Sequence, residues 1–186
     1  MTLILASASP RRRELLTRIT GDFEVVAPLV SECTSGDAAG RVLASACAKA
    51  RDVASRRAGV IVGADTLVVV DGEVLGKPSS RSDASRILRR LSGREHSVFT
   101  GLCVLSSPAG LERTAVEETL VRFRDLGWDE ITDYVSSGEP DGKAGAYAIQ
   151  GQAAHFVERI DGDYTNVIGL PLSRLVLLLR EVGLPV

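Results

Sequence analysis

The sequence predicts an α/β protein with long strands in a mixed sheet, folded as a single domain over residues 1–186. Segments with apolar residues at helical spacing alternate with β-rich runs along the whole chain, which is typical of this class. The dipeptide Asp71-Gly72 joins two such runs and predicts a tight hairpin, and therefore an antiparallel pair. At 186 residues, 45% of them apolar, the chain is long enough for one substantial core.

The first elements expected are a strand in the apolar run "LILA" and a helix that follows it. Ser9 suits the N-cap, and the proline after it suits the first helical position. Three arginines, Arg11, Arg12 and Arg13, then fall in the first turn, where the helix dipole disfavours each cation by roughly 0.3–1 kcal/mol. Charge-assisted contacts to an anion are worth roughly 1.5–3 kcal/mol each. We therefore predict that Arg11 and Arg12 bind phosphate and that Arg13 lies on the solvated face; three solvated arginines are the alternative.

The remaining elements follow from periodicity and from turn residues. In order, they are a strand at 23–28, a helix at 37–57, two β-rich runs within 59–70 separated by Gly-Ala-Asp, the hairpin at Asp71-Gly72, a helix from Ser82 to Gly93, strands at 96–105 and 112–126, a helix at 128–138, a glycine-rich loop at 142–151, a strand at 154–160 and a helix from Leu172 to Val182. In the predicted helix at 37–57, one face is shared by Val42, Ala46, Lys49 and Val53.

Composition excludes several classes of protein. A net charge of −2 gives no broad basic field for nucleic acid, so no nucleic-acid partner is expected. No apolar run approaches the roughly 18 residues of a membrane span, and the start has no signal-peptide pattern, so we expect a cytoplasmic protein without a membrane partner. Cys33, Cys47 and Cys103 are odd in number and widely spaced, which favours buried free thiols over a disulfide framework or a zinc motif.

Asp65 is the first candidate for chemistry, because it interrupts the apolar run "VIVGADTLVVV". Burying a carboxylate without a paired cation or a metal ion destabilises the folded state by several kcal/mol, about 3–5 kcal/mol where the partner of a buried pair is removed. It is therefore either the cap of a turn or a metal ligand or general base at the end of a strand.

The lysines give a second signal. The chain has 19 arginines but only three lysines, at Lys49, Lys77 and Lys143. Lysine supplies a compact point charge that the guanidinium fork does not replace, although chance could also explain three positions. The glycine-rich loop adds Tyr147 and Gln150, which could contact a flat group. Together with the arginines, these residues indicate phosphoryl chemistry, with water activated by a carboxylate and a hard divalent cation.

Six motifs carry a resemblance to a known family. They are "SASPRR", "GADT", "GKP", "LSGREHSVFTG", "SGEPDGKAGAYAIQG" and "NVIGLP", and in this order they span almost the whole chain. They resemble the Maf family of nucleoside triphosphate pyrophosphatases. The resemblance implies a fold like that of inosine triphosphate pyrophosphatase, an elongated twisted mixed sheet flanked by helices with two lobes around a cleft. It also implies cation-dependent hydrolysis of a nucleoside triphosphate to the monophosphate and pyrophosphate.

The resemblance also assigns roles to individual residues. It implies Asp65 and Glu32 as catalytic carboxylates and ligands of Mg²⁺ or Mn²⁺, Lys49 and Lys77 as catalytic lysines that contact phosphate, Ser7, Ser9, Arg11, Arg12 and Lys143 as substrate-binding residues, and Arg11, Thr66 and Gln150 as the trio that marks specificity for dTTP and UTP. The alternatives are a pyrophosphatase for 7-methyl-guanosine or other purine triphosphates, and a nucleotide-binding regulator of septum formation in cell division. The expected partner is the nucleoside triphosphate, and a homodimer is the alternative to a monomer.

Overall fold

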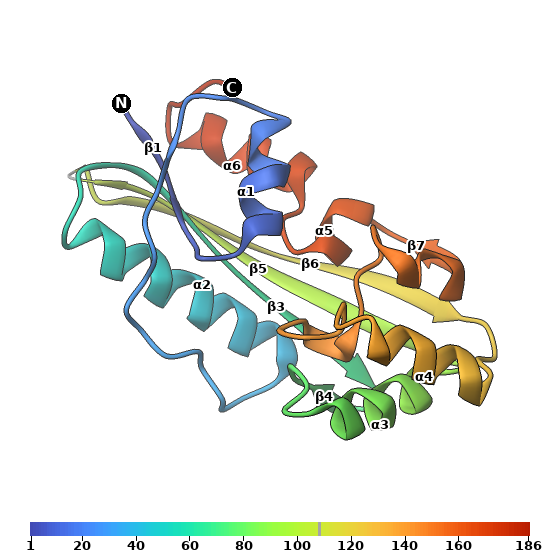
Figure 1. Ribbon diagram of the computed structural model, residues 1–186. Coiled ribbons are helices and arrows are strands. Elements are labelled where there is room, and N and C mark those ends of the chain that lie inside the picture. The colour runs from blue at the N-terminus through green and yellow to red at the C-terminus, as the bar shows by residue number, and fades with distance from the viewer. Residues whose placement is uncertain (108) are drawn as a thin grey trace. The chain divides into compact units, whose positions relative to one another are not determined.

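The computed structural model describes residues 1–107 and 109–186 (Figure 1). Its strands are β1 (Leu3–Ala6), β2 (Glu24–Val25), β3 (Gly59–Val70), β4 (Glu73–Leu75), β5 (Glu95–Ser107), β6 (Leu111–Phe123) and β7 (Val157–Asp161). Its helices are α1 (Pro10–Thr17), α2 (Ala38–Ala54), α3 (Arg81–Leu91), α4 (Trp128–Ser136), α5 (Tyr164–Ile168) and α6 (Leu172–Glu181), with short 3-10 helices η1 (Ala144–Ala146) and η2 (Gln152–Phe156). The predicted α/β class is confirmed.

The strands form one seven-stranded sheet in the order β2-β1-β3-β5-β6-β7, and β4 pairs with β3 outside this path. β1 pairs in parallel with both β2 and β3, and its residue Leu5 lies opposite Val25 on one side and Val62 on the other. The pairs β3–β4 and β6–β7 are antiparallel. The sheet is therefore mixed, as the sequence predicts.

The chain divides into two compact units. The first comprises residues 1–66, 100–117 and 169–186, and the second comprises residues 67–99 and 118–168. The strands β3, β5 and β6 each contribute residues to both units. Within the described residues, none of the helices has both the length and the apolar content that a membrane span requires.

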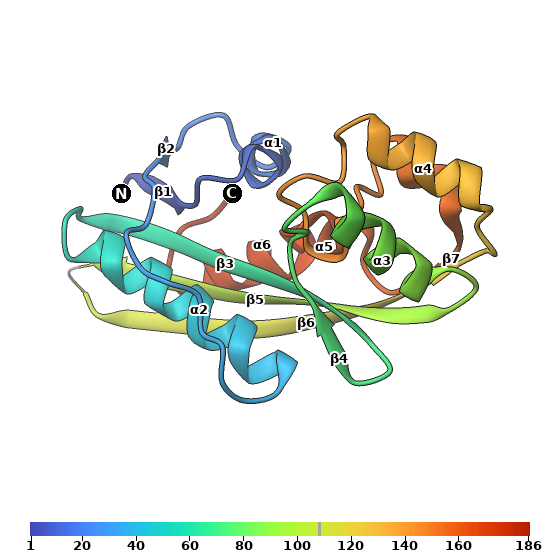
Figure 2. The same cartoon turned by 60° about the horizontal axis from the view of Figure 1, so that its bottom comes forward.

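In the first unit, α2 lies directly on β3 and β5 (Figures 1 and 2). Glycines in the two strands permit this close approach. A Cβ atom at Gly63 would lie 2.2 Å from the carbonyl oxygen of Ala46, and one at Gly101 would lie 2.4 Å from that of Val42. No heavy atom fits at those distances, so each glycine leaves room for the backbone of the helix.

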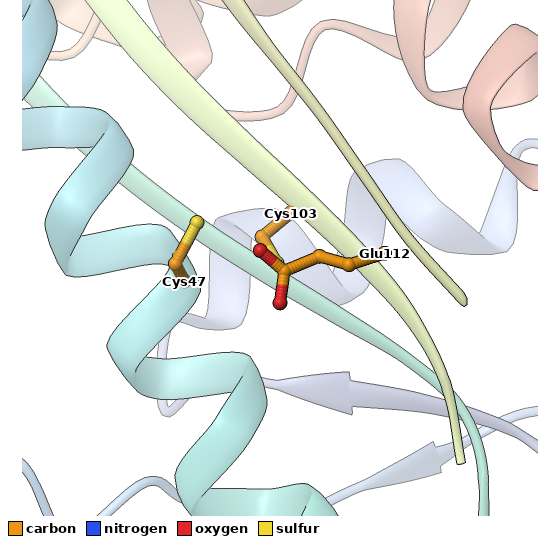
Figure 3. Close-up of side chains that lie close together, drawn as sticks. All are labelled: Cys47, Cys103 and Glu112. Atoms are coloured by element: carbon orange, nitrogen blue, oxygen red, sulfur yellow. The ribbon is translucent and has the colours of Figure 1, made fainter. Parts of the chain in front are cut away.

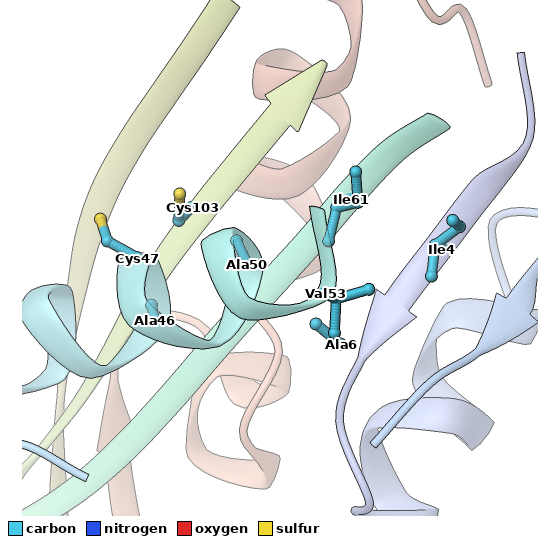
Figure 4. Packing of buried hydrophobic residues seen from close by; sticks show 8 residues of the cluster. All are labelled: Ile4, Ala6, Ala46, Cys47, Ala50, Val53, Ile61 and Cys103. Atoms are coloured by element: carbon cyan, nitrogen blue, oxygen red, sulfur yellow. The ribbon is translucent and has the colours of Figure 1, made fainter. Parts of the chain in front are cut away.

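The buried face of α2 builds the core of this unit. Two of the three cysteines, Cys47 and Cys103, are buried free thiols, as predicted, and they come from α2 and β5 (Figure 3). Cys33 is also a free thiol, but it is only partly buried because it lies in an exposed loop, so the prediction of burial is wrong for this residue. The core cluster contains Ile4, Ala6, Ala46, Cys47, Ala50, Val53, Ile61 and Cys103 (Figure 4). The face predicted from helical spacing is confirmed, because its four residues, Lys49 included, are all buried.

In the second unit, α3 and α4 pack against each other and α3 also contacts η1 (Figure 2). Its interior contains aromatic rings in edge-to-face contact. Phe123 lies 4.9 Å from Tyr147 and 5.9 Å from Phe156, between ring centroids, and His96 lies 5.0 Å from Phe123. Such pairs add roughly 0.5–1.5 kcal/mol beyond the burial of their area. Through Tyr147, the glycine-rich loop at 142–151 is packed against this aromatic core.

Several elements differ from the sequence prediction. β3 runs unbroken through Gly63, Ala64 and Asp65, so the prediction of two runs separated there is wrong. The helix expected from Ser82 begins after Ser80, whose hydroxyl accepts from the amide of Asp83. The strand expected at 154–160 starts only at Val157, because η2 precedes it, and the strand expected at 23–28 has two residues. The segment of α5 was not predicted as a helix.

The hairpin prediction is confirmed. β3 and β4 pair with Val70 opposite Glu73. The two turn residues, Asp71 and Gly72, have φ of 50° and 76°, which fits the two-residue turn that suits the twist of antiparallel strands.

Candidate active site

The turn between β1 and α1 is held by two serines. The hydroxyl of Ser7 accepts a hydrogen bond from the amide of Ser9 at 3.1 Å, and Ser7 is buried. The hydroxyl of Ser9 accepts from the amide of Arg12 at 3.5 Å, so Ser9 is the N-cap that the sequence predicts. The first turn of α1 contains no acidic residue. Its positive end is therefore not neutralised by the helix itself.

Arg12 turns back from this helix toward β3. Its Nε donates to the carbonyl oxygen of Gly169 at 2.8 Å, and its Nη2 donates to Oγ1 of Thr66 at 3.0 Å. Oγ1 of Thr66 also lies 2.9 Å from Oγ1 of Thr100. Burial lowers the pKa of the Arg12 guanidinium, and the nearby charge of Asp65 opposes this change. Arg12 remains a cation whose direction is fixed by two distant segments of the chain, at Thr66 and at Gly169.

Arg11 and Arg13 are the other two arginines of the first turn. Arg13 is exposed, as predicted, whereas Arg11 is partly exposed. The charge of Arg11 contributes to lowering the pKa of Arg12, so the two cations lie close enough to repel each other. An anion beside them would relieve that repulsion.

Lys49 joins two carboxylates. Its Nζ donates to Oδ1 of Asp65 at 2.6 Å and to Oε1 of Glu32 at 3.2 Å. Lys49 is 7% exposed and Asp65 is 4% exposed, so the Lys49–Asp65 pair is shielded from water. Because Asp65 lies inside β3 and pairs with Lys49, the alternative in which it caps a turn is wrong. Its expected position at the end of a strand is also wrong, since the ammonium group compensates its charge and the strand continues.

The loop that carries Glu32 is attached to α2 beside Lys49. The amide of Cys33 donates to Oγ of Ser45 at 2.8 Å, and Nε of Arg41 donates to the carbonyl oxygen of Cys33 at 3.4 Å. The Glu32 side chain keeps an exposed fraction of 45%. One carboxylate of the pair is thus buried and the other faces solvent.

The two carboxylates fit a hard divalent cation. Both present oxygen atoms to one position, the ammonium group of Lys49, which shows that they can converge on a single positive charge. Mg²⁺ and Mn²⁺ prefer oxygen ligands, and Mg²⁺ is commonly held by one or two carboxylates with substrate phosphates and water. Asp65 and Glu32 are therefore the residues that would hold it.

The second unit contains the remaining predicted residues. Lys77 and Gln150 are exposed, and Nζ of Lys143 donates to the carbonyl oxygen of Glu139. The amide of Gly145 donates to the carbonyl oxygen of Gly76 at 3.2 Å, which places the segment after Lys143 next to the segment of Lys77. These two lysines therefore lie on neighbouring segments of one unit.

A hydrogen-bond network of Tyr134 and Glu139 shapes the loop that bears Gln150. The hydroxyl of Tyr134 donates to Oε1 of Glu139 at 2.9 Å and accepts from the amide of Ala148 at 3.1 Å. Oε2 of Glu139 accepts from the amide of Gln152 at 3.1 Å. Tyr134 and Glu139 thus hold the loop on both sides of Gln150.

The structure distributes the predicted residues between the two units. Ser7, Ser9, Arg11, Arg12, Glu32, Lys49, Asp65 and Thr66 belong to the first, and Lys77, Lys143 and Gln150 belong to the second. Sequence reasoning did not single out Thr100, Gly169, Tyr134 or Glu139. All of them except Tyr134 lie inside the quoted motifs, which was the available signal.

Comparisons with known proteins show which family the chain resembles. The family described as "Maf-like protein" matches residues 2–182. A protein of Dictyoglomus thermophilum is 47% identical over 185 residues, covering 97% of this chain and 96% of its own. A protein of Thermococcus gammatolerans is 49% identical, with 99% and 98% covered, and one of Symbiobacterium thermophilum is 50% identical, with 99% and 95% covered. Each of the three is named dTTP/UTP pyrophosphatase.

Proposed function

Because the chain belongs to the Maf family, we propose that it is a nucleotide pyrophosphatase that hydrolyses dTTP and UTP to the nucleoside monophosphate and pyrophosphate. The observation that carries the proposal is the buried ammonium group of Lys49 between Asp65 and Glu32. One water and one nucleoside triphosphate give one nucleoside monophosphate and one pyrophosphate. The reaction requires a general base that takes a proton from water, cations that bind the triphosphate, and groups that recognise the nucleobase.

Asp65 is the proposed general base. Its Oδ1 accepts from Lys49, which leaves the second oxygen of the carboxylate to accept a proton from the attacking water. The hydrogen bond from Lys49 fixes the plane of this carboxylate, so the base is oriented before the substrate binds. The water then attacks the α-phosphorus atom, and the bond to the bridging oxygen of pyrophosphate breaks.

The cations of the first unit are proposed to bind the phosphates. Arg11 and Arg12 lie in the first turn of α1, where the helix amides also face outward and Ser7 and Ser9 shape the turn. Lys77 and Lys143 are proposed to contribute further positive charge from the second unit. Charge that develops on the leaving pyrophosphate is stabilised by such groups because they are oriented beforehand.

Asp65 and Glu32 are proposed to hold Mg²⁺ or Mn²⁺. When bound, this cation would neutralise charge on the phosphates and lower the pKa of water. The chain's own part is to present two carboxylates, one of them exposed, and to compensate them with Lys49 while the cation is away.

Thr66, Arg11 and Gln150 are proposed to select pyrimidine bases. Thr66 is fixed by Arg12 and Thr100, and Gln150 lies exposed on the loop held by Glu139. An amide offers both a donor and an acceptor to the edge of a base, so it can distinguish uracil and thymine from larger bases.

Nucleoside triphosphates are abundant in the cytoplasm, and we infer that the protein acts there, with its substrate as partner. A homodimer is kept as the alternative to a monomer, and light scattering on the eluted peak of a sizing column distinguishes the two.

The test is release of pyrophosphate from dTTP, UTP, CTP, ATP, GTP and 7-methyl-GTP with Mg²⁺ or Mn²⁺. We expect dTTP and UTP to be preferred, and Asp65→Asn to lower kcat by about 10²–10⁴-fold, the usual contribution of a general base. Asp22→Asn, at an exposed position, is the matched control and should keep full activity. Preference for 7-methyl-GTP or a purine would contradict the proposed base selection, and equal turnover by Asp65→Asn would contradict the role of the carboxylate.

A further inference from the structure

A second group of potential ligands lies in the first unit and takes no part in the proposed hydrolysis. Cys47 of α2, Cys103 of β5 and Glu112 of β6 bring two sulfur atoms and a carboxylate oxygen within 4.8 Å of one another. Figure 3 shows the three side chains meeting between the helix and the two strands. Among the described residues, 1–107 and 109–186, these three form the group of His, Cys, Asp or Glu side chains whose ligand atoms lie this close together.

The surroundings of this group are apolar on one side and charged on the other. Both thiols belong to the core cluster of Ile4, Ala46, Ala50 and their neighbours (Figure 4). Glu112 reaches them from the surface, where Arg51 donates to it from Nε at 3.0 Å and from Nη2 at 2.7 Å. Arg51 is one helical turn from Cys47, so a guanidinium group compensates the carboxylate beside the thiols.

The two thiols are not equivalent. A hydrogen bond from Cys103 lowers the pKa of the Cys47 thiol, while the same bond and burial raise the pKa of the Cys103 thiol. A coordinating thiol is deprotonated, so both sulfurs would bind a cation as thiolates.

The geometry points to a binding site for a thiophilic divalent cation, Zn²⁺, formed by Cys47, Cys103 and Glu112. Zn–S bonds of about 2.3 Å place two sulfurs of a tetrahedral site about 3.8 Å apart, so the side chains need to move together by about 1 Å at most. Thiolate ligands favour Zn²⁺ over Mg²⁺, which separates this site from the carboxylate pair at Lys49. Water takes the fourth position.

The charges balance. Binding releases two thiol protons to solvent, and two thiolates with one carboxylate around Zn²⁺ leave a net charge of −1, which Arg51 compensates. The bound ion would connect α2, β5 and β6. The sequence shows no zinc motif because the ligands come from three separate elements. Cys47 and Cys103 come together because Gly101 lets α2 approach β5 closely.

The experiment uses the full chain, reduced and freed of metal, in excess Mg²⁺. Zn²⁺ is titrated by calorimetry, and Co²⁺ is added as a spectroscopic probe. We expect one equivalent of Zn²⁺ per chain and, with Co²⁺, the thiolate charge-transfer absorption of a tetrahedral complex. Cys47→Ser and Cys103→Ser should each weaken binding by about 100-fold or more, whereas Cys33→Ser, which removes the third thiol of the same unit, should leave it unchanged.

A further variant keeps the test decisive if a core cysteine variant does not fold. Glu112→Gln retains both thiols and the hydrogen-bonding shape of the side chain, and it should weaken binding. Asp65→Asn should keep the cobalt absorption even though the proposed hydrolysis is lost, so the two proposals fail separately. Absence of the charge-transfer absorption, loss of binding in Cys33→Ser or Asp65→Asn, or formation of a Cys47–Cys103 disulfide in place of zinc binding would each overturn the inference.

Discussion

Replacing Lys49 by Met tests whether the ion pair at the candidate site is as costly to break as its burial implies. The substitution keeps most of the side-chain volume and removes the ammonium group 2.6 Å from Asp65. Asp65, 4% exposed, would then be a buried carboxylate without its ion-pair partner. Breaking a buried pair in this way costs about 3–5 kcal/mol. For a chain of this length, 3 kcal/mol corresponds to a fall in Tm of roughly 6–12 °C.

The free energy of unfolding of Lys49→Met is measured by urea denaturation, together with Asp65→Asn and the double variant. We expect the double variant to recover much of the lost stability, with a coupling energy of about 2 kcal/mol. Its activity should stay lost, because the proposed base is absent. Arg18→Met is the matched control, since Arg18 and Glu14 form an exposed pair, with side-chain exposures of 51% and 67%, whose loss should cost less than about 1 kcal/mol. A coupling energy below about 0.5 kcal/mol between Lys49 and Asp65 would refute the reasoning.

Three further predictions concern the core and the loop. Burial lowers the pKa of His96 to about 3, so below about pH 6.5 the unfolded chain binds a proton that the folded chain does not, and stability should fall by up to about 1.4 kcal/mol per pH unit. Urea melts from pH 7 to 4.5 should show a weaker fall in His96→Gln and an unchanged one in exposed His155→Gln; equal slopes in all three proteins would contradict this. Gly63→Ala places a methyl group 2.2 Å from a carbonyl oxygen of α2 and should cost about 1–3 kcal/mol and lower kcat, whereas Gly21→Ala, with open space around it, should do neither in the same assays. Glu139→Gln should raise KM for dTTP and UTP several-fold with little change in kcat, because it weakens the bonds that hold the Gln150 loop; steady-state kinetics check this, and an unchanged KM would argue against the positioning role.

The local elements of the fold were predictable because their signals are local. The hairpin follows from Asp71-Gly72, and the buried face of α2 follows from the spacing of its apolar residues. The unbroken course of β3 was not predictable in the same way. A carboxylate in an apolar run reads as the end of a strand, and the group that compensates it, Lys49, comes from a helix that precedes the strand in the chain.

Much of the candidate site was also predictable, for a different reason. Arg12, Lys49 and Asp65 each break a local rule of charge or burial, and such residues are expected at functional sites. Their partners are harder to foresee. Arg12 is held by the carbonyl oxygen of Gly169, and no backbone carbonyl can be singled out from a sequence pattern. The proposed zinc ligands were equally hard to foresee, since thiols from separate elements share no spacing.

The shortness of α1 has a consequence for the dynamics of the site. The helix has eight residues, fewer than the roughly 12–15 at which an isolated helix becomes marginally stable in water. It is therefore maintained by the burial of Leu15 and Leu16 and by the contacts of Arg12 with distant backbone. Local opening of this helix would release Arg12 without unfolding the sheet, and an anion bound at its first turn would oppose that opening. The amides of α1 thus report occupancy of the site through their rate of hydrogen exchange.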